Sequence, residues 1–179
     1  DDSSSLLPIS NLQANIFPGT EELFMEDILI APLKSFIQSK DLINPVLIKI
    51  DVQGFESEII KNGKNKIRDS LVVQIETSPI PLYNEEMPFS YICNQLEQLG
   101  FNLHMFNEIK TRIFKPMLLE KNIYSGLNHL LQLDCVFVKN LNNLNKLNVE
   151  NLKKMILIMF WSFKSYDLVH LLVSELDKL

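Results

Sequence analysis

Two carboxylates stand at the ends of two similar apolar runs, and their position is the one best suited to chemistry. The run Val46–Ile50 leads into Asp51, and the run Leu71–Ile75 leads into Glu76. Short β-branched runs of this kind are typical of buried strands in a parallel sheet. In an open α/β sheet, ligands bind beyond the carboxyl ends of such strands, so we expect both carboxylates to face one crevice. There they could accept a hydroxyl proton, bind an ammonium group or ligate a divalent cation.

Each acid in this region also has a structural interpretation. Asp51 could be the N-cap of a helix that begins after Gly54, since Asp is a favoured N-cap residue. Glu76 could be a solvated strand end. Glu56 falls in the first turn of the predicted helix, where its charge suits the helix dipole, so we interpret it as structural.

The remaining polar aromatic side chains carry weaker signals. The three histidines show no metal-ligand spacing, and we expect each to be exposed or hydrogen-bonded: His104, His129 and His170. We interpret Tyr91 and Tyr124 as packing residues. Tyr83 follows the loop that leaves Glu76, so it could also line a pocket.

A strand, helix, strand unit positions the two carboxylates. The pattern predicts a short helix over 55–62, with Gly63 as the C′ residue of positive φ. A strand, a helix and a second strand joined by short connections form a βαβ unit. The proline-punctuated segment 77–81 then leaves the sheet, because proline cannot continue a central strand.

The later part of the chain predicts one more helix and two more strands. Apolar residues recur at helical spacing over 89–99, and Gly100 closes that helix. Strands are expected over 101–106 and 133–139, as an antiparallel pair at the edge of the sheet.

The two ends of the chain differ from this central region. Residues 1–31 read as mostly loop, with a short strand near 26–30, and Ala31–Lys40 reads as a helix. We divide the chain into a sheet domain, 1–140, and a helical extension, 141–179. Two amphipathic helices over 149–179 are expected to pack on a protein surface, and they offer a route to an oligomer.

Composition excludes several classes of function. The formal net charge of −5 and the 22% charged content disfavour nucleic acid, which needs clustered Lys and Arg. The chain has two cysteines, Cys93 and Cys135, which indicates a reducing compartment and no disulfide framework. No signal peptide is visible, and the longest apolar run, 155–161, is far shorter than the ~20 residues of a membrane span. We therefore expect a soluble, cytoplasmic protein without a membrane partner.

One segment carries a resemblance. Residues 47–56, Leu-Ile-Lys-Ile-Asp-Val-Gln-Gly-Phe-Glu, resemble the "LLKIDVEGxE" signature of the FkbM methyltransferases, with Gln53 where that family usually has Glu. Val73–Glu76, Leu96–Phe101 and Leu133–Val138 resemble later segments of the family in the same order. Residues 3–8 resemble a segment upstream of the signature.

The resemblance implies a class I methyltransferase that transfers a methyl group from S-adenosylmethionine, usually to oxygen. It implies a Rossmann-like sheet with antiparallel edge strands, and an acceptor hydroxyl on a sugar, glycolipid or secondary metabolite. Asp51 and Glu76 would be catalytic, and Asp51 and Gln53 would lie beside the cofactor. Related enzymes hold a divalent cation at such strand ends, so a metal is an alternative here, without assigned ligands.

The chain departs from the family in its glycines. Its five glycines are too dispersed to form a glycine-rich cofactor loop: Gly19, Gly54, Gly63, Gly100 and Gly126. We therefore interpret the sheet as truncated at its amino-terminal side, and expect the 179-residue chain alone to bind S-adenosylmethionine weakly or not at all. The alternative function is a non-catalytic remnant of a methyltransferase domain that serves as a protein-interaction module.

Overall fold

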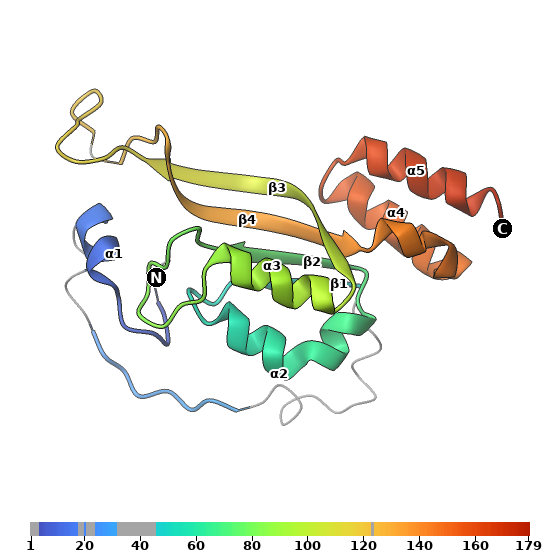
Figure 1. Ribbon diagram of the computed structural model, residues 1–179, viewed down its shortest axis with the longest axis horizontal. Coiled ribbons are helices and arrows are strands. Elements are labelled where there is room, and N and C mark those ends of the chain that lie inside the picture. Colours follow the sequence, from blue (N-terminus) through green and yellow to red (C-terminus); the bar gives the residue numbers. More distant parts are fainter. Residues whose placement is uncertain (1–3, 18–19, 21–23, 32–45, 123) are drawn as a thin grey trace.

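The computed structural model describes residues 4–17, 20, 24–31, 46–122 and 124–179. Its centre is a mixed four-stranded sheet with the order β1-β2-β4-β3 (Figure 1). The strands are β1 (Leu47–Ile50), β2 (Val72–Thr77), β3 (Phe101–Arg112) and β4 (His129–Lys139). β1 and β2 are parallel, β4 lies antiparallel to β2, and β3 lies antiparallel to β4. Within the described residues, no strand pairs with the outer edge of β1.

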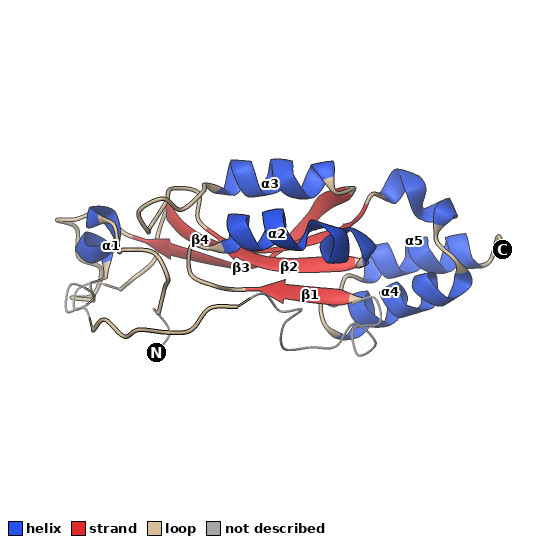
Figure 2. Ribbon diagram, turned by 90° about the horizontal axis from the view of Figure 1, so that it is seen from below, coloured by secondary structure: helices blue, strands red, loops and turns tan. Residues whose placement is uncertain are grey.

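Two helices cover one face of the sheet, as the βαβ pattern predicts. They are α2 (Glu56–Asp69) and α3 (Phe89–Gln98), and they lie on the same side of the strands (Figure 2). Their apolar residues share a buried core with the strand residues that point to this face, including Val73, Ile75, Cys135 and Phe137. This packing fixes the end of β1 and the end of β2 side by side.

The prediction that α2 ends before Gly63 is wrong, because the helix continues through it to Asp69. Ile60 and Ile67, seven residues apart, both lie in the core at 2% and 3% exposure. An interior helical glycine costs about 1 kcal/mol relative to alanine. Burial of Ile67 in one continuous apolar stripe outweighs that cost.

The opposite face is covered over only half of its length. The helices α4 (Val149–Trp161) and α5 (Tyr166–Leu176) follow the 3-10 helix η2 (Leu141–Lys146). They form a second core with Leu71, Val72, Val136 and Val138 at the beginning of β2 and the end of β4. Figures 1 and 2 show this helical hairpin at the end of the sheet away from α1. The two predicted helices of the tail are confirmed, and they share their core with the sheet.

The late strands are longer than predicted and differ in position. β3 extends to Arg112 and β4 begins at His129, so the pair forms a long hairpin that projects beyond β2. Of these two late strands, β3 alone lies at an edge of the described sheet, because β4 lies between β2 and β3. Register shifts interrupt β3 at three places, which breaks the alternation that sequence patterns depend on.

The amino-terminal region contains a short helix, α1 (Asn11–Ile16), capped by the side chain of Ser10. The predicted strand near 26–30 is wrong, because residues 24–31 adopt no regular structure and Phe24 is 97% exposed. The predicted helix over Ala31–Lys40 lies outside the described residues, apart from Ala31.

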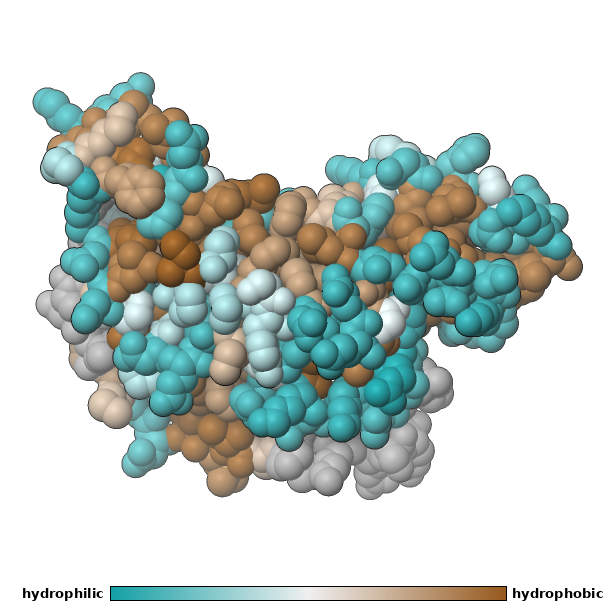
Figure 3. Space-filling model, in the orientation of Figure 1, coloured by the Kyte–Doolittle hydropathy of each residue, from teal (hydrophilic) through white to brown (hydrophobic). Residues whose placement is uncertain are grey.

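Apolar residues also reach the surface at both ends of the molecule. Figure 3 shows them over the helical hairpin and over the projecting tip of the β3–β4 hairpin. Among the described residues, no helix combines the length and apolar character required to span a membrane.

Candidate functional site

The site is built on a tight turn after β1. Gln53 and Gly54 both have positive φ, 51° and 100°, which turns the chain back toward α2. A Cβ atom at position 54 would come within 2.9 Å of the Tyr83 ring, so only glycine fits there without displacement. Glu56, 4% exposed, accepts a hydrogen bond from the Val52 backbone N–H at 3.0 Å and closes the turn. Burial raises the pKa of Glu56.

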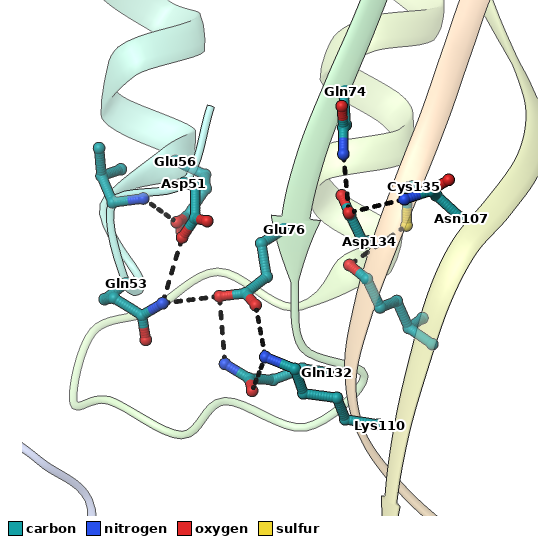
Figure 4. Close-up of polar contacts among 12 residues, drawn as sticks. Asp51, Gln53, Glu56, Gln74, Glu76, Asn107, Lys110, Gln132, Asp134 and Cys135 are labelled. Atoms are coloured by element: carbon teal, nitrogen blue, oxygen red, sulfur yellow. Dashed lines mark hydrogen bonds and ion pairs between the residues drawn. The ribbon is translucent and has the colours of Figure 1, made fainter. Parts of the chain in front are cut away.

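Gln53 connects the two strand-end carboxylates (Figure 4). Its Nε2 donates to Asp51 Oδ1 at 3.2 Å and to Glu76 Oε2 at 2.7 Å. Its Oε1 accepts a hydrogen bond from the Tyr83 hydroxyl at 2.9 Å. The structure therefore brings together Asp51, Gln53 and Glu76, the three residues singled out by sequence, at the carboxyl ends of β1 and β2.

Glu76 is the more enclosed of the two carboxylates, with a side chain 13% exposed against 37% for Asp51. Lys110 of β3 pairs with its Oε1 at 3.3 Å, and Gln132 of β4 donates to its Oε2 at 3.2 Å. Burial raises the pKa of Glu76, the charge of Asp51 raises it further, and Lys110 and Gln53 oppose both effects. The net result is a carboxylate with a raised pKa in a polar setting.

Asp51 is half-exposed and pairs with Lys49 at 3.4 Å. The N-cap interpretation of Asp51 is wrong, because α2 begins at Glu56 and its N-cap is Phe55, which makes no side-chain capping bond. Asp51 is therefore left facing the open side of the turn, where a ligand can reach it.

A second polar cluster extends the site along β4 and β3. Asp134 Oδ2 accepts hydrogen bonds from Gln74 at 2.7 Å and from Asn107 at 3.3 Å, while its buried Oδ1 has no partner (Figure 4). Together these groups line a depression on the uncovered half of the sheet: Lys49, Asp51, Glu76, Glu108, Lys110, Gln132 and Asp134. Four carboxylates against two ammonium groups give this depression a net negative charge.

The loop after β2 forms the other wall of the site. Glu86, 7% exposed, accepts hydrogen bonds from the backbone N–H groups of Leu82 and Tyr83 at 2.7 and 3.0 Å. Thr77, 3% exposed, has a hydroxyl with no partner. It borders a small hollow together with Gln53 and Glu76. This hollow offers an unused hydrogen-bonding group beside the Gln53 bridge.

Other residues considered from the sequence lie elsewhere. His104 is at the opposite end of the sheet, where its Nε2 lies 2.7 Å from Ser165 Oγ, and burial lowers its pKa. His129 stacks on Phe114. Cys93 and Cys135 are free thiols on the α2–α3 side, and burial raises their pKa values to about 11 and about 12.

Sequence reasoning missed Lys110, Gln132 and the hydrogen-bonding role of Tyr83. Lys110 and Gln132 lie in the parts of β3 and β4 beyond the predicted strands. The alternation of Leu131 and Leu133 around Gln132 is the one signal that could have extended β4 to this point.

No group of three or more His, Cys, Asp or Glu residues within the described ranges is arranged to hold a metal ion. Asp51 and Glu76 are instead joined by a neutral amide, with Lys49 and Lys110 as the nearest paired cations. The divalent cation considered from sequence therefore has no assigned ligand set.

Comparison with known proteins gives one match. The family model described as the methyltransferase FkbM domain matches residues 29–103, a segment that contains β1, β2 and the Gln53 bridge. No curated protein sequence and no solved structure matches the chain at the significance required. The match supports a methyltransferase and does not favour the interaction module. Residues 29–103 are therefore similar to the FkbM methyltransferase domain, the same family whose signature the segment after β1 resembles.

Proposed function

We propose that the protein is an S-adenosylmethionine-dependent methyltransferase that methylates a hydroxyl group of a sugar, a glycolipid or a secondary metabolite. The observation that carries the proposal is the bridged pair of carboxylates, Asp51 and Glu76, at the carboxyl ends of neighbouring parallel strands. The pair lies within the segment that matches the methyltransferase family. Ligands of open α/β sheets bind at this edge.

The two carboxylates have different roles in this proposal. A hydroxyl oxygen must lose its proton as it attacks a methyl carbon, and a positioned carboxylate with a raised pKa is a suitable proton acceptor. Glu76 has that raised pKa, and Lys110 and Gln132 hold its side chain in place. Asp51, the more exposed of the two, contacts the ligand directly.

The described residues fit the positively charged part of the cofactor. When bound, S-adenosylmethionine supplies an electrophilic methyl group on a sulfur that carries positive charge. The negative depression around Asp51 suits such a charge. The unpartnered Thr77 hydroxyl lies in the separate small hollow that it borders with Gln53 and Glu76. The dispersed glycines form no glycine-rich turn, so we assign no contact to the adenosine part.

Replacing Asp51 by Ala tests the proposal. We expect methyl transfer to fall by roughly 10²-fold, because a positioned group at the reacting centre is lost. The free energy of unfolding should change by about 0.5 kcal/mol or less, because the side chain is half-exposed. The measurements are transfer of a radiolabelled methyl group to a panel of sugars and glycolipids, and urea unfolding.

Asp177→Asn is the matched control, because Asp177 is an exposed acid after α5 at the far end of the sheet. It should retain full activity. Full turnover in Asp51→Ala would show that Asp51 does not act in methyl transfer.

A further inference from the structure

A chain of hydrogen bonds leads from α1 into the candidate site. Gln13 of α1, 4% exposed, donates from Nε2 to the Tyr83 hydroxyl at 3.2 Å. Tyr83, 2% exposed, donates in turn to Gln53 Oε1 at 2.9 Å. Gln53 then donates from Nε2 to both Asp51 and Glu76. The helix α1, the turn after β1, and the end of β2 with the loop that follows it thus meet in one continuous network.

The direction of each donation follows from the number of protons available. A tyrosine hydroxyl has one proton to donate and can also accept hydrogen bonds. Because it accepts from Gln13, its own proton is free for Gln53 Oε1. The reversed Gln53 amide would place its carbonyl oxygen against two carboxylates, which is unfavourable because no proton lies between these acceptors.

The backbone of the turn is held by separate contacts. The Ser5 hydroxyl donates to the Gln53 carbonyl oxygen at 2.5 Å, and Gly54 packs against the Tyr83 ring. Tyr83 therefore contacts both the backbone turn and the side chain of Gln53. This double contact separates its role from that of an ordinary buried aromatic residue.

We propose that Tyr83, held by Gln13, is a positioning residue that fixes the Gln53 amide so that its NH₂ group keeps Asp51 and Glu76 together. We call the hydrogen-bonded series Gln13, Tyr83 and Gln53 the relay. Its contribution to catalysis rests on the function proposed above, because the two carboxylates are the groups that would face acceptor and cofactor. The relay also gives the amino-terminal segment a role, since Gln13 and Ser5 both act on Gln53.

The relay makes a prediction for the titration of Glu76. The charged groups that face Glu76 are Asp51 after β1 and Lys110 of β3, and the hydrogen bond from Gln53 favours its ionised form. Loss of that bond leaves the repulsion from Asp51 less opposed, so the pKa of Glu76 should rise.

The experiment is a carboxyl ¹³C NMR titration of the full chain in which Glu76 is followed in three variants. Gln53→Leu removes the amide and should raise the pKa of Glu76. Tyr83→Phe removes only the hydroxyl and should produce at least half of that rise. Tyr166→Phe, at an exposed tyrosine of α5, should leave the titration at its wild-type position.

The relay is wrong if Tyr83→Phe titrates like the wild type, or if Gln53→Leu has no effect. Should Tyr83→Phe fail to fold, Gln13→Glu decides the question. A carboxylate at position 13 takes the Tyr83 proton away from Gln53, so the pKa of Glu76 should again rise, and a wild-type titration would overturn the proposal. The titration requires no methyl transfer, so a positive titration with an active Asp51→Ala enzyme would reject the proposed function and not the relay.

Discussion

The two halves of one sheet face differ sharply in polarity. At the beginning of β2 and the end of β4, Val72, Val136 and Val138 are fully buried beneath α4 and α5. Further along the same strands and on the same face, Glu76 and Asp134 replace the valines, and no described helix covers them. The helical hairpin stops where the apolar residues stop.

This difference shows how a sheet can stabilise the fold and leave room for a ligand on a single face. Apolar burial stabilises by about 25 cal/mol per Å², so the helices gain by covering the valines. Covering the carboxylates would cost free energy, because buried charges lose their hydration. The covered half holds the structure together, and the open half is free to bind.

The largest expected effect comes from the covered half. Leu152 of α4 is fully buried in the second core, so Leu152→Ala should lower the free energy of unfolding by about 2–5 kcal/mol. Leu157→Ala, on the same helix at a side chain 58% exposed, should change it by about 0.5 kcal/mol or less. Urea unfolding measures both. Equal losses in the two variants would contradict the assignment of α4 to the core.

A smaller effect is expected from the open half, and it depends on pH. The folded state raises the pKa of Glu76 above the ordinary value of 4.5, so this group favours folding in acid. That contribution is lost as the pH rises through the raised pKa. Between pH 4.5 and neutrality, the free energy of unfolding, measured by urea unfolding, should therefore fall less in Glu76→Gln than in the wild type. Glu108→Gln, at an exposed acid of the same depression, is the control and should follow the wild-type curve.

The smallest effect is expected at His104, with the opposite dependence on pH. Burial lowers the pKa of His104 below 6.5 in the folded protein, although Asp167 partly opposes the shift. Its contribution is present above pH 6.5 and is lost as the pH falls through the lowered pKa. His104→Gln should therefore lose less stability on acidification than the wild type. His170→Gln, on the exposed side of α5, should lose as much stability on acidification as the wild type. If the unfolding free energies of the two variants depend on pH in the same way, His104 does not have this role.

The positions of Asp51 and Glu76 could be predicted from sequence, because two apolar runs joined by a short helix bring equivalent ends together. The βαβ unit and the two tail helices were predictable for the same reason, since their hydrophobic periods are regular. The bridge between the carboxylates was not, because it depends on the positive φ of Gln53 and on the Tyr83 hydroxyl. Neither feature can be recognised from the pattern of residue types alone.

The irregular strand β3 and the uneven cover of the sheet account for two differences between prediction and structure. The bulged part of β3 carries Asn107, Glu108 and Lys110 close together, so its sequence lacks the alternation of a strand. The apolar run of β1 predicts a buried strand, but Lys49 is exposed because its face belongs to the open half of the sheet. Whether a strand residue is exposed depends on which elements cover its face of the sheet, and tertiary packing decides that cover.

The raised pKa values of the two cysteines have a practical consequence for studying this molecule. Thiol-reactive probes attack the thiolate, and at neutral pH Cys93 and Cys135 hold almost none. A cysteine introduced on the exposed surface would therefore react first, without prior removal of the native pair. A pair of fluorescent or spin labels, one on the helical hairpin and one on the projecting tip of the β3–β4 hairpin, would then report the separation of the two ends of the molecule in solution.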